Sequence, residues 1–237
     1  MGSTIPARLA MLVIGAVVIV LAVAWMRQQP VSRPTGTGSA PPAAVTGTAG
    51  FADARTQLAQ LPIKEWDRHT DYSRAQFGEP WTDEVDVEFG HNGCNTRDDI
   101  LRRDLGELTV RPGTCYAGSG VLRDPYTGAT IAFVRGPDTS GAVQIDHLVS
   151  LSDAWYKGAR QWDAQRRRDF ANDPRNLLAV GATPNFDKAF RDAAGWLPPD
   201  TAFRCEFVAR QVAVKAAYGL WVSAKEKQAM AAVLAGC

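Results

Sequence analysis

An apolar, β-branched run, VQIDHLVSL at residues 143–151, carries Asp146 and His147 side by side in its middle. Such a run is typical of a buried strand, where a charged or polar side chain costs free energy unless it has a partner. A histidine can also exchange a proton near neutral pH and so act as an acid or a base. The pair is therefore either a hydrogen-bonded core pair or part of a site that does chemistry.

Polar residues further along the chain favour the second interpretation. Asn176 opens NLLAV, a second apolar strand-like run, and TPNFDKAF then places Asn185 three positions before Lys188. The order along the chain is Asp-His, Asn-Leu and Asn-x-x-Lys. These residues are the candidate site.

This order resembles that of HNH nucleases of the ββα-metal type. Residues 94–237 resemble the branch named after the GmrSD restriction endonuclease C-terminal domain, in an exported bacterial form. The segments that carry the resemblance are, in order, GCNTRDDILRRDL, DPYTG, QIDHLVSLSDAW, FANDPRNLLAV, PNFDK, WLPP and the closing cysteine. The resemblance implies an α+β fold with a ββα-metal (HNH) core of two short strands and a helix, embellished with flanking helices and disulfides.

The resemblance also implies a role for each candidate. His147 is implied to be the general base that deprotonates the attacking water, and Asp146 and Asn185 to be metal ligands. Asn176 would brace the loop between the two strands and orient His147, and Lys188 would contact phosphate. One carboxylate, one amide, water and phosphate oxygens suit Mg²⁺ or Mn²⁺, which prefer hard ligands.

Two further features bear on function. Arg97, in the segment NTRDDILRR, is a substrate-binding candidate on the same resemblance. Ala189 and Phe190 follow Lys188, where family members commonly have Gly or Ser and then Asp. This departure favours the alternative of a non-catalytic secreted binding domain that retains the HNH framework.

The leading prediction is a divalent-metal-dependent endonuclease that hydrolyses phosphodiester bonds. DNA is preferred over RNA as substrate, and low sequence specificity is expected because no base-reading module is visible. A net charge of +1, from 26 Lys+Arg and 25 Asp+Glu, gives no global basic field. A nucleic acid would therefore be bound through a local patch, and no protein partner can be deduced.

The N-terminal segment, residues 1–27, is predicted to be a signal peptide or a membrane anchor. Residues 9–26 form 18 successive apolar positions, closed by Arg27. This length is roughly 27 Å as a helix, near the lower limit for a membrane span, and residues 22–24 also read as a signal-peptidase site. An anchor is preferred because the run continues through Trp25. The protein is therefore expected to be extracellular or tethered to the outer face of the cytoplasmic membrane.

Two more segments complete the predicted organisation. Residues 28–50 are rich in Pro, Gly and Thr without an apolar face, so they predict a flexible linker. Residues 51–237 form the predicted HNH nuclease-like domain, with its core at 140–200.

The cysteines, Cys94, Cys115, Cys205 and Cys237, all lie in that domain. An even number in an exported chain predicts disulfides, and the absence of a Cys-x-x-Cys pair argues against zinc. Of the three pairings, the sequence-local one is preferred, Cys94 with Cys115 and Cys205 with Cys237.

Apolar spacing and turn residues predict an α+β domain. The stretch 66–93 shows no period and is expected to be mostly loop. Helices are predicted over 51–61, 95–105, 152–162, 163–173, 203–219 and 223–234, and strands over 108–113, 115–123, 130–136, 143–151 and 176–180.

Overall fold

The computed structural model describes residues 48–67 and 69–237. The predicted signal or anchor segment and most of the predicted linker lie outside these residues. The described part is an α+β domain, as predicted. Its helices are α2 (Thr48–Gln60), α3 (Thr96–Asp104), α4 (Leu151–Tyr156), α5 (Ala164–Asn172), α6 (Ala182–Lys188), α7 (Arg204–Tyr218) and α8 (Ala224–Ala235), and its strands are β1 (Gly106–Val110), β2 (Ala117–Arg123), β3 (Thr130–Val134), β4 (Val143–His147) and β5 (Leu177–Gly181).

The capping residues of two helices confirm the predicted helix starts. The Asn95 side chain accepts a hydrogen bond from the Asp98 amide at the start of α3. Ser223 does the same for the Glu226 amide at the start of α8. These side chains satisfy backbone donors that a helix leaves unpaired in its first turn. Helix α2 begins at Thr48, three residues before the predicted start of the domain.

The chain forms two separate antiparallel sheets within the described residues, one of strands β1-β2-β3 and one of the pair β4-β5. The predicted DPYTG turn joins β2 to β3, and the Gly128 amide donates to the Asp124 carbonyl at 2.8 Å. In the pair β4-β5, Ile145 lies opposite Ala179 and His147 opposite Leu177.

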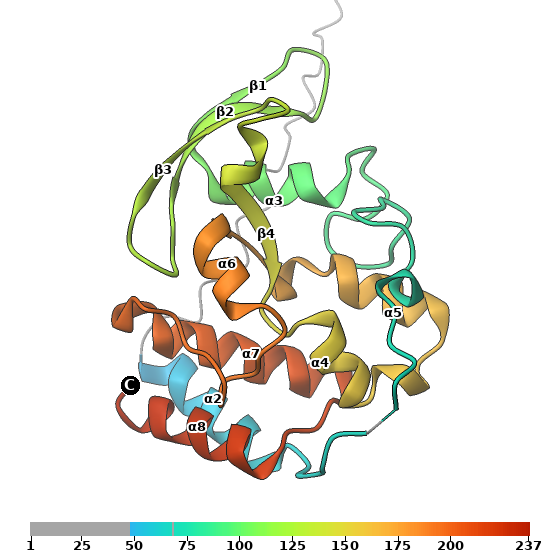
Figure 1. The fold of residues 1–237 in the computed structure, drawn as a ribbon, viewed down its shortest axis with the longest axis vertical. Helices are drawn as coiled ribbons and strands as arrows, with labels where there is room; N and C mark the ends of the chain where they lie inside the picture. Colours follow the sequence, from blue (N-terminus) through green and yellow to red (C-terminus); the bar gives the residue numbers. More distant parts are fainter. Residues whose placement is uncertain (1–47, 68) are drawn as a thin grey trace, which may run out of the picture. The chain divides into compact units, whose positions relative to one another are not determined.

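The pair β4-β5 lies between two apolar clusters, which explains why both strands are so apolar. Val143, Ile145 and the facing residues of β5 pack with α3 and the three-stranded sheet. On the other face, Leu178 and Val180 pack with α2, α7 and α8, and the same helices lie together in Figure 1. Successive strand residues point to opposite faces, so neighbouring side chains in β4 enter different surroundings.

A third apolar cluster supports the end of β4. It joins Phe77, from the short 3₁₀ helix Arg74–Phe77, to α4, α5 and the last turn of α7. Strand β4 ends at His147, and Ser150 then caps α4. Asp146 and His147 therefore lie at the carboxyl end of the strand instead of in its middle.

Both predicted disulfides are present. Cys94 pairs with Cys115, with Cα atoms 5.6 Å apart, and Cys205 pairs with Cys237, with Cα atoms 5.9 Å apart. The first bond holds the loop before α3 against the start of β2. The second attaches the last residue of the chain to the first turn of α7.

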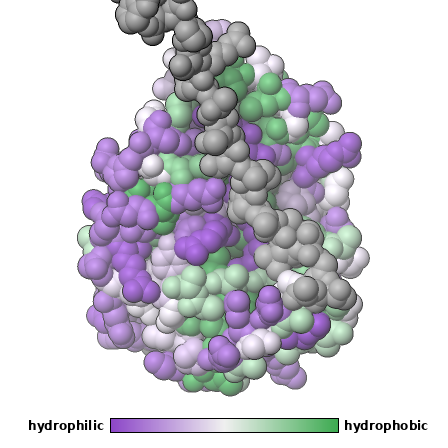
Figure 2. Space-filling view, turned by 180° about the vertical axis from the view of Figure 1, so that it is seen from behind, coloured by the Kyte–Doolittle hydropathy of each residue, from purple (hydrophilic) through white to green (hydrophobic). Residues whose placement is uncertain are grey.

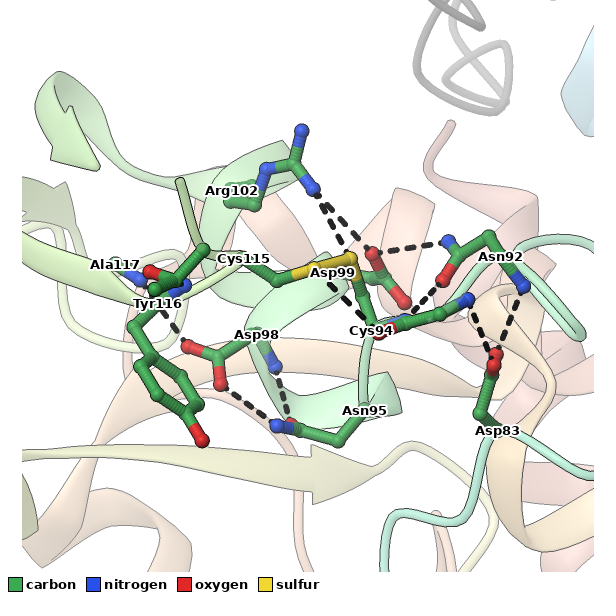
Figure 3. The surroundings of a disulfide bond; sticks show 12 residues. Asp83, Asn92, Cys94, Asn95, Asp98, Asp99, Arg102, Cys115, Tyr116 and Ala117 are labelled. Atoms are coloured by element: carbon green, nitrogen blue, oxygen red, sulfur yellow. Dashed lines mark hydrogen bonds and ion pairs between the residues drawn. A yellow bond between two sulfur atoms is a disulfide. The ribbon is translucent and has the colours of Figure 1, made fainter. Parts of the chain in front are cut away.

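The loop that precedes Cys94 is held by hydrogen bonds between its own residues as well as by the disulfide (Figure 3). The Asp83 carboxylate accepts hydrogen bonds from the amides of Asn92 and Gly93, and the Asp83 carbonyl accepts from the His91 amide. The Thr96 amide donates to the Trp81 carbonyl. These contacts hold both ends of the segment from Trp81 to Thr96.

The surface seen from behind intersperses hydrophilic and hydrophobic residues (Figure 2). Singly exposed apolar residues are normal for folded domains. Among the described residues, no helix combines the length and hydropathy needed to span a bilayer. The apolar run 9–26 lies outside the described residues.

Candidate active site

His147 is almost entirely buried at the end of β4, with 6% of its surface exposed. Its Nε2 atom lies 2.8 Å from the carbonyl oxygen of Ala171. Because a carbonyl oxygen can only accept, Nε2 carries the proton and Nδ1 keeps its lone pair. The ring of Trp81 stacks on the imidazole, with centroids 5.7 Å apart and planes 13° apart. The imidazole is thus held in one orientation, with Nδ1 as its basic atom.

Burial lowers the pKa of His147 from 6.5 to about 3. The hydrogen bond to Ala171 opposes this shift, and the positive charges of Arg74 and Lys188 add to it. The value lies well below the one near 6.5 that an exposed imidazole would have. His147 is therefore neutral throughout the physiological pH range.

This depressed pKa predicts that the folded protein loses stability in acid. Between pH 6.5 and about 3 the unfolded chain binds a proton at His147 that the folded chain does not, so the free energy of unfolding falls as the pH falls. At pH 5 the loss relative to pH 7 is about 2 kcal/mol. Urea unfolding at both pH values should show it for the natural chain and not for His147→Gln.

Asp99 is among the buried carboxyl groups that work in the opposite direction over the same range. Burial raises the pKa of Asp99 to about 6, so its contribution to stability grows as the pH falls through 6. The comparison between the natural chain and His147→Gln cancels this contribution, because Asp99 is present in both. An equal pH dependence in the two chains would contradict the buried, neutral His147.

A small pocket opens beside His147, with a volume of about 260 Å³ including its mouth. The segment from Arg74 to Trp81 forms one side of it, and His147 lies on the other with the end of α5. Trp81 adopts a left-handed backbone, with φ of 60°. Such strain is kept where surrounding structure enforces it, often at functional sites. The residues that line the pocket are Arg74, Phe77, Gly78, Glu79, Pro80, Trp81, His147, Leu151, Ala171 and Asn172.

Asp146 faces away from this pocket, toward α6 and the cluster around α7. Its carboxylate accepts a hydrogen bond from the Tyr126 hydroxyl at 2.5 Å. The ammonium of Lys188 lies 3.1 Å from one carboxylate oxygen and 3.0 Å from the other, and it also donates to the His147 carbonyl at 2.8 Å. Lys188 is fully buried. The lysine predicted to contact phosphate is thus enclosed, and it joins Asp146 to the backbone of His147.

Asn176 holds the segment that follows β4. Its side-chain oxygen accepts from the Val149 amide at 2.8 Å, and its side-chain nitrogen donates to the Val149 carbonyl at 3.1 Å. Its own carbonyl accepts from the Leu148 amide. Asn176 is fully buried and touches the chain within two residues of His147.

The remaining two candidates lie further from the imidazole. Asn185, on α6, donates its side-chain amide to Gln144 at 2.7 Å, on the same face of β4 as Asp146. Arg97 donates to the carbonyls of Ser140 and Val143, at the opposite end of β4 from His147. The fold therefore brings Asp146, His147, Asn176 and Lys188 together, leaves Asn185 nearby and separates Arg97.

The contacts of Asp146 do not fit a bound divalent ion as they stand. Both oxygens of Asp146 already face the Lys188 ammonium. The side-chain nitrogen of Asn185 donates to Gln144, which leaves its oxygen as the atom that could bind an ion. Across residues 48–67 and 69–237, no three His, Cys, Asp or Glu side chains gather in a way that could hold a metal. An ion at Asp146 would have to displace the ammonium.

Sequence reasoning missed the segment that forms the pocket. Arg74 and Trp81 lie in the stretch 66–93, predicted only to be mostly loop, and that stretch supplies one whole side of the pocket. No apolar period marks these residues. The available signal was the length of the stretch itself, because long structureless segments in compact domains are commonly functional.

The fold and the site define a disulfide-linked α+β domain with a buried neutral histidine beside a small pocket. Residues 95–233 match the family described as GmrSD restriction endonucleases, C-terminal domain. The chain therefore belongs to this nuclease-related family, which confirms the resemblance to the branch named after the GmrSD C-terminal domain.

A curated relative also covers most of the chain. It is a protein of the fungus Arthroderma benhamiae described as an uncharacterized secreted protein, 34% identical over 186 residues, or 78% of this chain and 84% of the relative. This relative is fungal, so it lends no support to a specifically bacterial form. No solved structure matches the chain.

Proposed function

We propose that this protein is an exported endonuclease that hydrolyses phosphodiester bonds with His147 as its general base. DNA is preferred over RNA as its substrate. The observation that carries the proposal is the buried neutral imidazole, whose Nε2–H is bound to the Ala171 carbonyl while its Nδ1 keeps a lone pair. Membership of a restriction-endonuclease domain family supports the same reaction class. The secreted fungal relative supports export.

The order of elements around His147 is also that expected of an HNH core. Strand β4 pairs with β5, and helix α6 follows β5 directly. His147 is the last residue of β4, Asn176 directly precedes β5, and Asn185 lies on helix α6. This arrangement supports the proposal of a ββα-metal fold.

The chemistry follows from the state of the imidazole. Nδ1 takes a proton from water as that water attacks phosphorus and the bond from phosphorus to the leaving oxygen breaks. The leaving oxygen takes a proton from solvent. Nε2–H stays bound to Ala171, so the ring does not turn during the transfer. A pKa of about 3 makes the free imidazole a weak base. An anionic phosphate beside the ring stabilises the imidazolium and raises this pKa, so basicity increases when substrate is bound.

A divalent cation, Mg²⁺ or Mn²⁺, remains part of the proposal, with Asp146 and Asn185 as its ligands. It would supply charge stabilisation at the leaving oxygen. No step above depends on it, because the present contacts of Asp146 are with Lys188 and Tyr126.

Cleavage of plasmid and of single-stranded DNA by the full chain, with its disulfides formed, tests the function. We expect nicking with Mg²⁺ or Mn²⁺ and none in EDTA. Nicking that persists in EDTA would uphold the nuclease function and contradict its dependence on a metal. If the folded chain cuts no nucleic acid with any metal, the alternative of a non-catalytic binding domain takes its place.

A further inference from the structure

We propose that Arg74 binds the phosphate group that reacts at His147, so that the substrate enters over the segment 74–81. This inference rests on the proposed nuclease function and adds a substrate-binding residue that the family motif around Asp146 and Asn185 does not include.

The pocket brings the two residues to one small space. Arg74 and His147 both line it, and its volume of about 260 Å³ includes open solvent at its mouth. Glu79 also lines the pocket, so Arg74 is the lining cation that can offset the charge of an entering phosphate.

Arg74 differs from the other arginines of this region in having its guanidinium available. Within residues 48–67 and 69–237, no hydrogen bond or ion pair joins the Arg74 side chain to another group, and the residue is exposed. By contrast, Arg160 pairs with Asp71, and Arg167 donates to the Gln76 carbonyl. A guanidinium that is free to make a two-pronged contact is the group best suited to a phosphate.

The segment that carries Arg74 is held firmly against α5. Phe77 is 2% exposed and packs on Trp155 and Phe170. Gly78 has φ of +81°, and a Cβ there would lie 2.6 Å from the Cγ of Arg168, so a larger residue would push the segment away. Packing therefore fixes the carboxyl end of the 3₁₀ helix whose first residue is Arg74.

The charges of the lining residues favour an anion in this pocket. A phosphate there would lie beside both the Arg74 guanidinium and the His147 imidazole, because both residues line the same small space. Arg74 thus contributes to binding of the reacting group.

Two substitutions test the proposal, Arg74→Ala and Arg74→Lys. The control is Arg111→Ala, which removes an exposed arginine beyond β1. We expect Arg74→Ala to lower kcat/KM for DNA cleavage roughly 10- to 100-fold, the range for a hydrogen bond to a charged group. It should also reduce the slope of log(kcat/KM) against log salt by about 1. Arg74→Lys should recover part of the rate, and Arg111→Ala should match the natural chain.

Two outcomes separate this inference from the proposed function. Arg74→Ala that cleaves like Arg111→Ala, while His147→Ala is inactive, would overturn the role of Arg74 and leave the nuclease intact. If the natural chain binds a labelled oligonucleotide but never cleaves it, the proposed nuclease function is wrong. The role of Arg74 in binding is then tested by fluorescence anisotropy in EDTA, which measures the affinity of each variant for the oligonucleotide. Unchanged affinity in Arg74→Ala overturns the proposal, and affinity lower by the same 10- to 100-fold upholds it.

Discussion

Replacement of His147 by alanine is expected to lower the rate of DNA cleavage by roughly 10²- to 10⁴-fold, the usual contribution of a general base. The reason is that His147 lines the pocket and keeps a lone pair on Nδ1, and alanine removes this nitrogen. The rate should be measured as first-order nicking of supercoiled plasmid at saturating enzyme, so that kcat and not binding is compared.

Alanine at this buried position also leaves a cavity under Trp81, so a second variant is needed. His147→Gln keeps a neutral side chain with an amide N–H that can donate to the Ala171 carbonyl, but it has no basic nitrogen. It should fold and remain as inactive as alanine. His91→Ala removes an exposed histidine of the loop before Cys94 and should cleave at the natural rate. Activity in His147→Gln close to that of the natural chain would exclude the imidazole as the base.

Replacement of Lys215 by methionine is expected to destabilise the fold by about 3–5 kcal/mol. Lys215 lies on α7, and its ammonium is 2.7 Å from Asp153 of α4 and 2.9 Å from Glu226 of α8. All three residues are at most 2% exposed. Lys157 contributes a second ammonium, 2.7 Å from Glu226 and also paired to Asp192.

The physical reason is the imbalance of charge that methionine leaves. The natural cluster already holds three carboxylates against two ammonium groups, and removal of one leaves Asp153 and Glu226 to share Lys157 without solvent. Removing one partner of a buried pair costs far more than the intact pair contributes. Urea unfolding at pH 7 measures the change.

Two matched variants make the result specific. Lys225→Met removes an exposed lysine on α8 and should change the free energy of unfolding by less than about 0.5 kcal/mol. Lys215→Met combined with Glu226→Gln removes one charge of each sign and should be less destabilised than the sum of the single changes, because the two sites interact. Additive effects would show that the cluster is not coupled as its distances indicate.

Helices, strands and disulfides followed from local patterns in the sequence. The predicted helix starts at Asn95 and Ser223 coincide with side chains that cap the helix through contacts within three residues. The sequence-local pairing of the cysteines was also confirmed. Apolar runs with β-branched residues placed both strands of the central pair, because burial on both faces selects such residues.

The candidate residues around His147 were also found from sequence, but their contacts were not. Spacing along the chain says that Asp146 and Lys188 belong to one site. Spacing does not predict that the two charges form an ion pair. The pair forms because α6 packs against β4, although Lys188 and Asp146 are 42 positions apart in the sequence. The role predicted for Lys188 assumed an exposed ammonium, and the packing of α6 encloses it.

The sequence by itself determined the α+β class, the disulfides, the family and the identity of the polar residues at the central strands. Tertiary structure alone decided which faces these residues occupy, the neutral state of His147 and the pocket that Arg74 and His147 both line. Desolvation and long-range contact set these properties. They arise only when segments far apart in sequence, here 74–81, β4 and α5, exclude water from the same space.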